Sequence, residues 1–87
     1  MKIKFFAPLN RIFGPIKELD FSHPVSVADV LRLLLEQEPD FALYAGFSSG
    51  DKHAWGLLVW RGKNLLTLND MLTPEDEVEM IVMVAGG

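Results

Sequence analysis

One segment of the sequence, from Ser26 to Pro39, has a clear helical pattern and is flanked by segments with strand patterns. Ser26 lies three positions before Asp29, as in a capping box, and a carboxylate there also favours the positive end of the helix dipole. Pro39 disfavours helical geometry at Glu38, so we expect the helix to end there. Apolar residues recur at helical spacing, and further leucines widen the apolar face: Val27, Val30, Leu31, Leu34, Leu33 and Leu35.

The short strand patterns around this helix set the order of elements. The expected strands are residues 2–7, 16–21, 55–60, 65–68 and 78–84, with a connection over 9–15 and one more helical turn over 40–45. The order β-β-α-β-β-β indicates an α+β fold, a β-grasp or ubiquitin-like roll, in which one main helix covers one face of a mixed sheet of four to five strands. A ferredoxin-like fold that lacks one helix is the alternative.

Size and composition exclude several classes of protein. The 87 residues suit a single domain over 1–87, with an extended tail over 84–87. Because the sequence has no cysteine, it can form no disulfide, thiolate zinc site or thiol nucleophile. A net charge of −4 is opposite to that of a nucleic-acid binder. No apolar run approaches the ~20 residues of a membrane span, so we expect a cytoplasmic protein with no membrane partner.

The side chains offer no active site. His23 and His53 have no partners at metal-ligand spacing, so we expect no metal site. No serine lies in a Gly-x-Ser-x-Gly elbow, and the glycines lack the spacing of a phosphate-binding loop. The acidic residues 75–77 beside a proline indicate a solvated turn. We therefore expect that the chain binds no cofactor and is not catalytic alone.

The last residues of the sequence are the remaining candidate for chemistry. Gly86 and Gly87 follow the last strand, and glycine has no side chain to obstruct a narrow channel. Residues 84–87 could extend by up to about 14 Å. A terminal carboxylate is ionised and unreactive at neutral pH, so it would need activation, which ATP could supply by forming an acyl-adenylate. The absence of cysteine fits, because a thiol could attack such an acyl group.

Four segments resemble the MoaD/ThiS family of ubiquitin-like sulfur carriers, and most closely the small subunit of molybdopterin synthase. These segments are Phe5-Phe6-Ala7 with Gly14, Ser26 to Leu31, Leu72 to Val78, and Val84-Ala85-Gly86-Gly87. The resemblance covers nearly the whole chain. Its most specific part is Asp76-Glu77-Val78 followed by the terminal Val-Ala-Gly-Gly.

This resemblance implies a function for the tail. An E1-like enzyme would use ATP to adenylate Gly87, which would then be converted to a thiocarboxylate. Val84, Ala85 and Gly86 would thread into the active site of the molybdopterin synthase large subunit, or of a similar sulfur acceptor, and deliver sulfur to a pterin precursor. The partner would supply the catalytic groups.

The chain departs from the family pattern in two places. Ile81-Val82-Met83 stands where the family often has Phe-Pro-Pro, and the loss of both prolines is expected to free the tail from a stiff geometry. The loop from Gly46 to Ala54 is longer than in compact members. A tungsten-cofactor carrier, a thiamine-pathway carrier and a protein modifier conjugated through Gly87 remain alternatives. A plain interaction module with an incidental glycine tail is the alternative from another class.

Strand alternation also predicts a second apolar face on the sheet. If the side chains of Ile3, Leu57 and Val78 point to the helix, alternation leaves another set on the opposite face. That set is Phe6, Leu58, Trp60, Ile81 and Met83. We predict that it is a partner interface, because it is too apolar for a monomer to leave in water. A one-residue slip would invert a strand's assignment, and some of these residues would then belong to the core.

Overall fold

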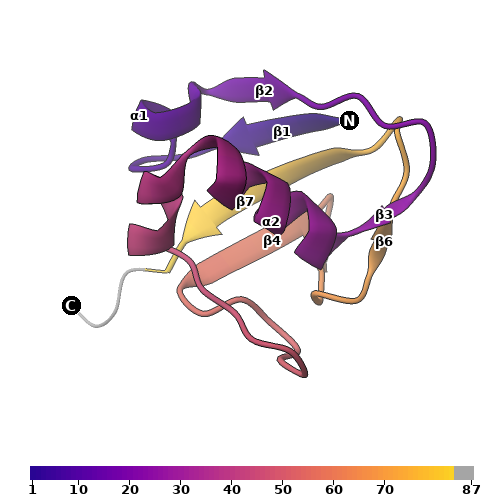
Figure 1. Ribbon diagram of the computed structural model, residues 1–87. Coiled ribbons are helices and arrows are strands. Elements are labelled where there is room, and N and C mark those ends of the chain that lie inside the picture. The colour runs from indigo at the N-terminus through magenta and orange to yellow at the C-terminus, as the bar shows by residue number, and fades with distance from the viewer. Residues whose placement is uncertain (84–87) are drawn as a thin grey trace.

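A mixed sheet of five strands, with one long helix on one face, forms the centre of the molecule (Figure 1). The computed structural model describes residues 1–83, so the predicted tail over 84–87 lies outside the described residues. The spatial order of the strands is β2 (Ile16–Glu18), β1 (Lys2–Phe5), β7 (Glu77–Val82), β4 (Leu57–Arg61) and β5 (Asn64–Leu65). β1 and β7 are parallel and the other neighbours are antiparallel. This arrangement is the β-grasp fold, which confirms the predicted fold class.

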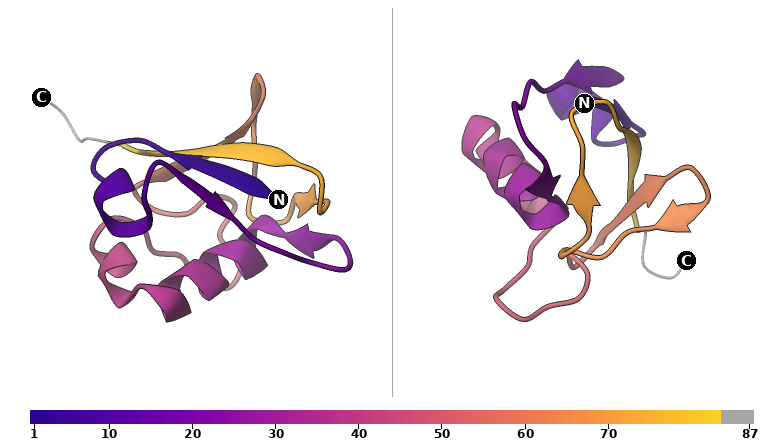
Figure 2. Two further views of the ribbon diagram at one scale, coloured as in Figure 1. Left: turned by 90° about the horizontal axis from the view of Figure 1, so that it is seen from above. Right: turned by 90° about the vertical axis from the view of Figure 1, so that its right-hand side faces the viewer.

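The remaining elements surround this sheet. The helices are α1 (Asn10–Phe13), α2 (Val27–Gln37) and the 3-10 helix η1 (Pro39–Leu43). β3 (Val25–Ser26) and β6 (Met71–Leu72) pair as a separate two-stranded sheet. Figure 2 shows α2 on one side of the five-stranded sheet, and within residues 1–83 no helix covers the other side. That uncovered side is called the outer face below.

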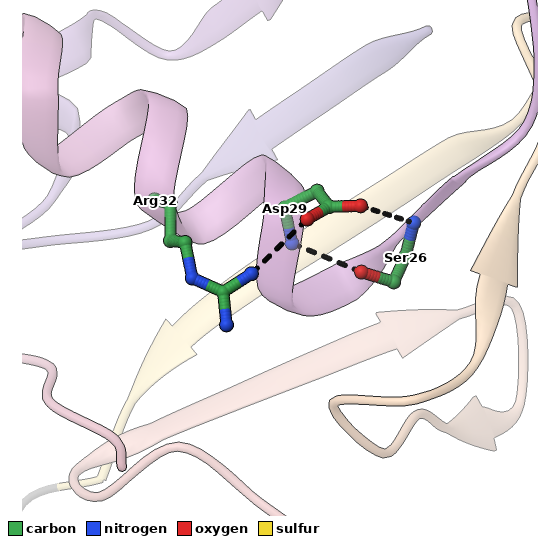
Figure 3. A network of polar contacts seen from close by, with 3 residues as sticks. All are labelled: Ser26, Asp29 and Arg32. Atoms are coloured by element: carbon green, nitrogen blue, oxygen red, sulfur yellow. Dashed lines mark hydrogen bonds and ion pairs between the residues drawn. The ribbon is translucent and has the colours of Figure 1, made fainter. Parts of the chain in front are cut away.

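The predicted capping box begins α2 (Figure 3). The Asp29 N–H donates to Ser26 Oγ at 3.1 Å, and the Ser26 N–H donates to Asp29 Oδ2 at 3.4 Å. Arg32 Nη1 donates to the other oxygen of Asp29 at 3.0 Å. The helix ends where expected, because Glu38 has extended backbone before Pro39.

The core lies between α2 and the inner face of the sheet. Leu31 and Leu34 of the helix are fully buried, as the helical spacing predicts. The strands contribute Ile3, Phe5, Leu57, Val59, Val78 and Met80, all buried. The inward set predicted from strand alternation is therefore confirmed for β1, β4 and β7.

Five short elements differ from the sequence-based expectation. The connection over 9–15 contains α1, in which Phe13 stacks on Phe5 with ring centroids 4.6 Å apart. The pair β3–β6 was not predicted, because two residues per strand show no period. The run expected over 65–68 pairs only through β5, since Leu66 and Leu68 turn into the core. β2 also ends at Glu18, although Leu19 was expected to continue it.

Candidate functional site

The predicted interface residues lie on or beside the outer face of the sheet. Leu58 of β4 pairs with Ile81 of β7, and both side chains are half-buried. Trp60, two positions after Leu58, is also half-buried. Phe6 follows β1 and Met83 follows β7, with exposed fractions of 45% and 50%. The structure thus brings these five side chains toward water, while their role in binding a partner stays a prediction.

Two further apolar residues of this face were missed from the sequence. Leu65 of β5 pairs with Trp60, and its side chain is exposed. Ile16 of β2 pairs with Lys4, and its side chain is also exposed. Strands of two or three residues show no alternation, so only the pairing register places these residues on the outer face.

Charged residues divide the outer face into unequal parts. Lys4 pairs with Glu79, and Lys2 Nζ lies 3.7 Å from the Glu77 carboxylate. The side chains of Lys2 and Glu77 are 40% and 67% exposed, so this ion pair adds little stability. These charges separate Ile16 from the other apolar residues. The apolar part of the face is therefore the side formed by β4, β5 and the end of β7.

Backbone hydrogen bonding continues past the last strand residue to Met83. Val82 pairs with Leu57 at the end of β7, and the Met83 N–H donates to the Gly56 carbonyl oxygen at 2.9 Å. Proline at 83 could not make this bond because it has no N–H. Residues 82 and 83 are therefore held by backbone pairing, while the expectation that losing the prolines frees the tail concerns residues 84–87 and stays a prediction. The predicted tail residues Val84, Ala85, Gly86 and Gly87 lie outside the described residues.

The segment with the most specific family resemblance has a structural role. Asp76 Oδ2 accepts hydrogen bonds from the Thr73 N–H at 2.8 Å and from Arg61 Nη1 at 3.0 Å. The same Arg61 nitrogen donates to the Met71 carbonyl at 2.9 Å, and the Asp76 carbonyl accepts from the Lys2 N–H at 3.0 Å. Asp76 and Arg61 together thereby join β1, β4 and β6 at the start of β7.

This environment favours the ionised form of Asp76. The hydrogen bond from the Thr73 N–H is the main cause that holds the pKa of Asp76 below its ordinary value. Partial burial opposes this effect, and the Arg61 guanidinium lowers the pKa further. The carboxylate is thus part of the scaffold that places β7.

Two other properties concern possible sites and membranes. Within residues 1–83, no group of three or more His, Cys, Asp or Glu side chains is arranged to hold a metal ion. No helix in the same range combines the length and apolar character that a membrane crossing needs.

The fold belongs to the ubiquitin-like β-grasp class, and a solved structure is similar to it. The crystal structure of SAMP1 from Haloferax volcanii superposes with a TM-score of 0.77 at 24% sequence identity. The alignment covers 100% of this chain and 98% of that chain. Neither a protein-family model nor a curated protein sequence matches this chain.

Proposed function

We propose that this chain is a ubiquitin-like sulfur carrier that donates sulfur in the biosynthesis of molybdopterin, the ligand of molybdenum and tungsten cofactors. In this proposal it is the small subunit of a molybdopterin synthase-like complex and has no catalytic activity alone. The observation that carries the proposal is the place of β7. This strand is central in the sheet, and its hydrogen bonding continues to Met83, four residues before Gly87.

The proposed chemistry begins at the Gly87 carboxylate. A carboxylate oxygen attacks the α-phosphorus of ATP in the active site of an E1-like enzyme, and pyrophosphate leaves. The product is a mixed anhydride, the acyl-adenylate. A hydrosulfide-equivalent donor then attacks the acyl carbon and displaces AMP, which leaves a thiocarboxylate. The sulfur acceptor would be bound in the large subunit, which supplies the catalytic groups.

The fold supports this role through the position of its apolar residues. Leu58 and Ile81 pair on the outer face, and Ile81 is two residues before Met83 on the same chain segment. A large subunit that binds this apolar side would therefore fix the point from which residues 84–87 start. Val84, Ala85, Gly86 and Gly87 would then enter the active site, and the two terminal glycines bring no side chain into it.

A protein modifier is the second candidate function. It would use the same adenylation at Gly87, but the amino group of a lysine would displace AMP and form an isopeptide bond. The replacement of Phe-Pro-Pro by Ile81-Val82-Met83 favours this candidate, because the sequence before the tail differs at this point from that of the synthase subunits that the chain resembles.

Intact-mass measurement of the protein isolated from its native host distinguishes these functions. A mass gain that matches the replacement of one oxygen by sulfur at the C-terminus is expected for the carrier. Conjugates in which Gly87 is linked to lysines of other proteins would instead support the modifier. An unmodified mass with no conjugates, under conditions in which the host makes the cofactor, would contradict both and support a plain interaction module.

A further inference from the structure

An open apolar groove of about 570 Å³ lies at the end of β7. Its lining includes Pro8, Leu43, Tyr44, Trp55, Val82 and Met83. The side chains of Leu43 and Trp55 are 73% and 72% exposed, more than any other large apolar side chain in residues 1–83. No Asp, Glu, Lys, Arg or His is among the described residues that line it. We call this feature the tail-root groove.

The backbone around the tail-root groove is held in place on two sides. Gly46 and Trp55 exchange two backbone hydrogen bonds, at 3.1 and 2.6 Å, which close the loop between η1 and β4. Gly56 follows with φ of +79°, and a Cβ atom there would lie 2.6 Å from the Tyr44 carbonyl oxygen. The Gly56 carbonyl accepts the Met83 N–H. The groove is thus a fixed feature of the fold, and the loop and the end of β7 share one hydrogen bond.

The groove is separate from the predicted interface on the outer face. Leu43 comes from η1, which follows α2, and Trp55 comes from the loop before β4. Of the five predicted interface residues, only Met83 lines the groove. Residues of η1, of the loop before β4 and of the end of β7 together line the groove.

The distance to Gly87 restricts what can cover this groove. Met83 forms part of the groove wall, and four residues separate it from the end of Gly87. Four extended residues span at most about 14 Å, so an enzyme that acts on the Gly87 carboxylate must bring its surface close to Met83. A second copy of this chain would occupy the same space and exclude that enzyme. Two copies also repel each other through their net charges of −4.

We propose that the tail-root groove binds an apolar, uncharged segment of the adenylating enzyme, beside the opening of its nucleotide site. This inference rests on the proposed function, because it takes Gly87 as the residue that is activated. Burial of Leu43 and Trp55 would remove two exposed apolar side chains from water. It would also place the enzyme at a fixed distance from the tail.

The test is ATP–pyrophosphate exchange with the E1-like enzyme of the same organism and the full chain as the varied substrate. The double variant Leu43→Ala with Trp55→Ala should raise the KM for the chain about thirtyfold, as expected for loss of an aromatic anchor. Its kcat should stay unchanged, because the contacts act equally in the ground and transition states. The melting temperature should also stay unchanged, since both side chains are exposed. Met71→Ala, an exposed apolar residue of β6, is the matched control and should change neither constant.

Two results would overturn the assignment while leaving the proposed function intact. One is exchange by the double variant with the KM of the wild type. The other is a concentration-dependent dimer of the wild-type chain that the double variant abolishes, which would assign the groove to a second copy. A wild-type chain that supports no exchange at all would overturn the proposed function and, with it, the assignment of this groove to the enzyme.

Discussion

Arg61 and Asp76 form an ion pair, with 3.0 Å between Arg61 Nη1 and Asp76 Oδ2, that joins the end of β4 to the turn before β7. The pair is partly buried; Arg61 also donates to the Met71 carbonyl of β6, and Asp76 also accepts the Thr73 N–H of the turn. A single carboxylate thus fixes the place where the central strand begins.

Asp76 should make stability depend on pH. Because its pKa is lower in the folded state than the ordinary 3.8, the unfolded chain binds the proton more readily. The contribution of Asp76 is therefore complete above pH 3.8 and is lost as the pH falls through the lower folded-state pKa. Asp76→Asn should destabilise the protein by about 1–2 kcal/mol at pH 7. Urea unfolding of both proteins from pH 7 to pH 2 measures this.

The difference between wild type and Asp76→Asn should shrink at the acidic end of this titration. Glu75→Gln, an exposed neighbour, is the control and should leave stability nearly unchanged at both ends. A gap between wild type and Asp76→Asn that stays constant down to pH 2 would contradict the role of the ionised carboxylate.

Leu31→Ala should remove a central contact of the helix with the sheet. Leu31 is 1% exposed, and such a truncation in a core costs about 2–5 kcal/mol. This is a large share of the ~5–10 kcal/mol that stabilises a small domain. The melting temperature measures the effect, and Leu43→Ala, the same change at an exposed leucine, should leave it unchanged. Equal melting temperatures for the two variants would show that α2 does not pack as described.

Gly56 should tolerate substitution less well than Gly50. Both have positive φ, +79° and +92°, so alanine is strained at either position. Only at Gly56 would the added Cβ also lie 2.6 Å from a backbone oxygen, whereas nothing lies within 4 Å at Gly50. Gly50→Ala should cost about 1–2 kcal/mol and Gly56→Ala more. Urea unfolding midpoints compare them, and equal costs would mean that the loop shifts freely to accept the methyl group.

If the proposed function holds, Trp60→Ala should weaken binding to the large subunit of the molybdopterin synthase-like complex. An aromatic anchor at an interface commonly contributes at least ~2 kcal/mol, about thirtyfold in affinity. The side chain is half-buried against its neighbours on the outer face, so the cost in stability should stay small. Calorimetric titration measures the affinity. Ile16→Ala is the control, because Lys4 and Glu79 separate Ile16 from Trp60 on the same face. Lost stability with unchanged affinity would assign Trp60 to the core instead.

Deleting Gly87 should abolish adenylation without unfolding the protein. The buried core of residues 1–83 runs from Met1 to Met80, and a glycine has no side chain to contribute to a core. Pyrophosphate exchange reports adenylation and the melting temperature reports the fold. If the shortened chain supported pyrophosphate exchange at the wild-type rate, Gly87 would not be the activated residue.

Local signals explain which parts of the fold were predictable from the sequence. The helix α2 was predicted because its capping box and apolar spacing lie within eleven residues of contiguous chain. The outward orientation of Leu58 and Trp60 was predicted from the alternation of side chains, because β4 is long enough to show that alternation. The helix α1 was missed because four residues are too few for a helical period.

The same distinction between local and long-range signals explains which residues of the candidate sites were predictable. The tail-root groove was not predictable, because Leu43 and Trp55 are brought together by the closed loop between them and show no common pattern. Leu65 and Ile16 were missed on the outer face because only pairing places them there. The roles of the terminal glycines stay a prediction, since the described residues end at 83.

Because β7 is central in the sheet and late in the sequence, the sheet can form only when nearly the whole chain is present. β1 pairs with β7 from Lys2 to Phe5. The first strand of the chain therefore cannot complete its pairing until residues 77–80 have been synthesised. Pairing between such distant segments forms late, because the chain must first close a long loop. A nascent or truncated chain without β7 lacks the strand that joins β1 and β2 to β4 and β5. A chain that ends before residue 77 is therefore expected not to fold, because it lacks the strand on which both halves of the sheet pair.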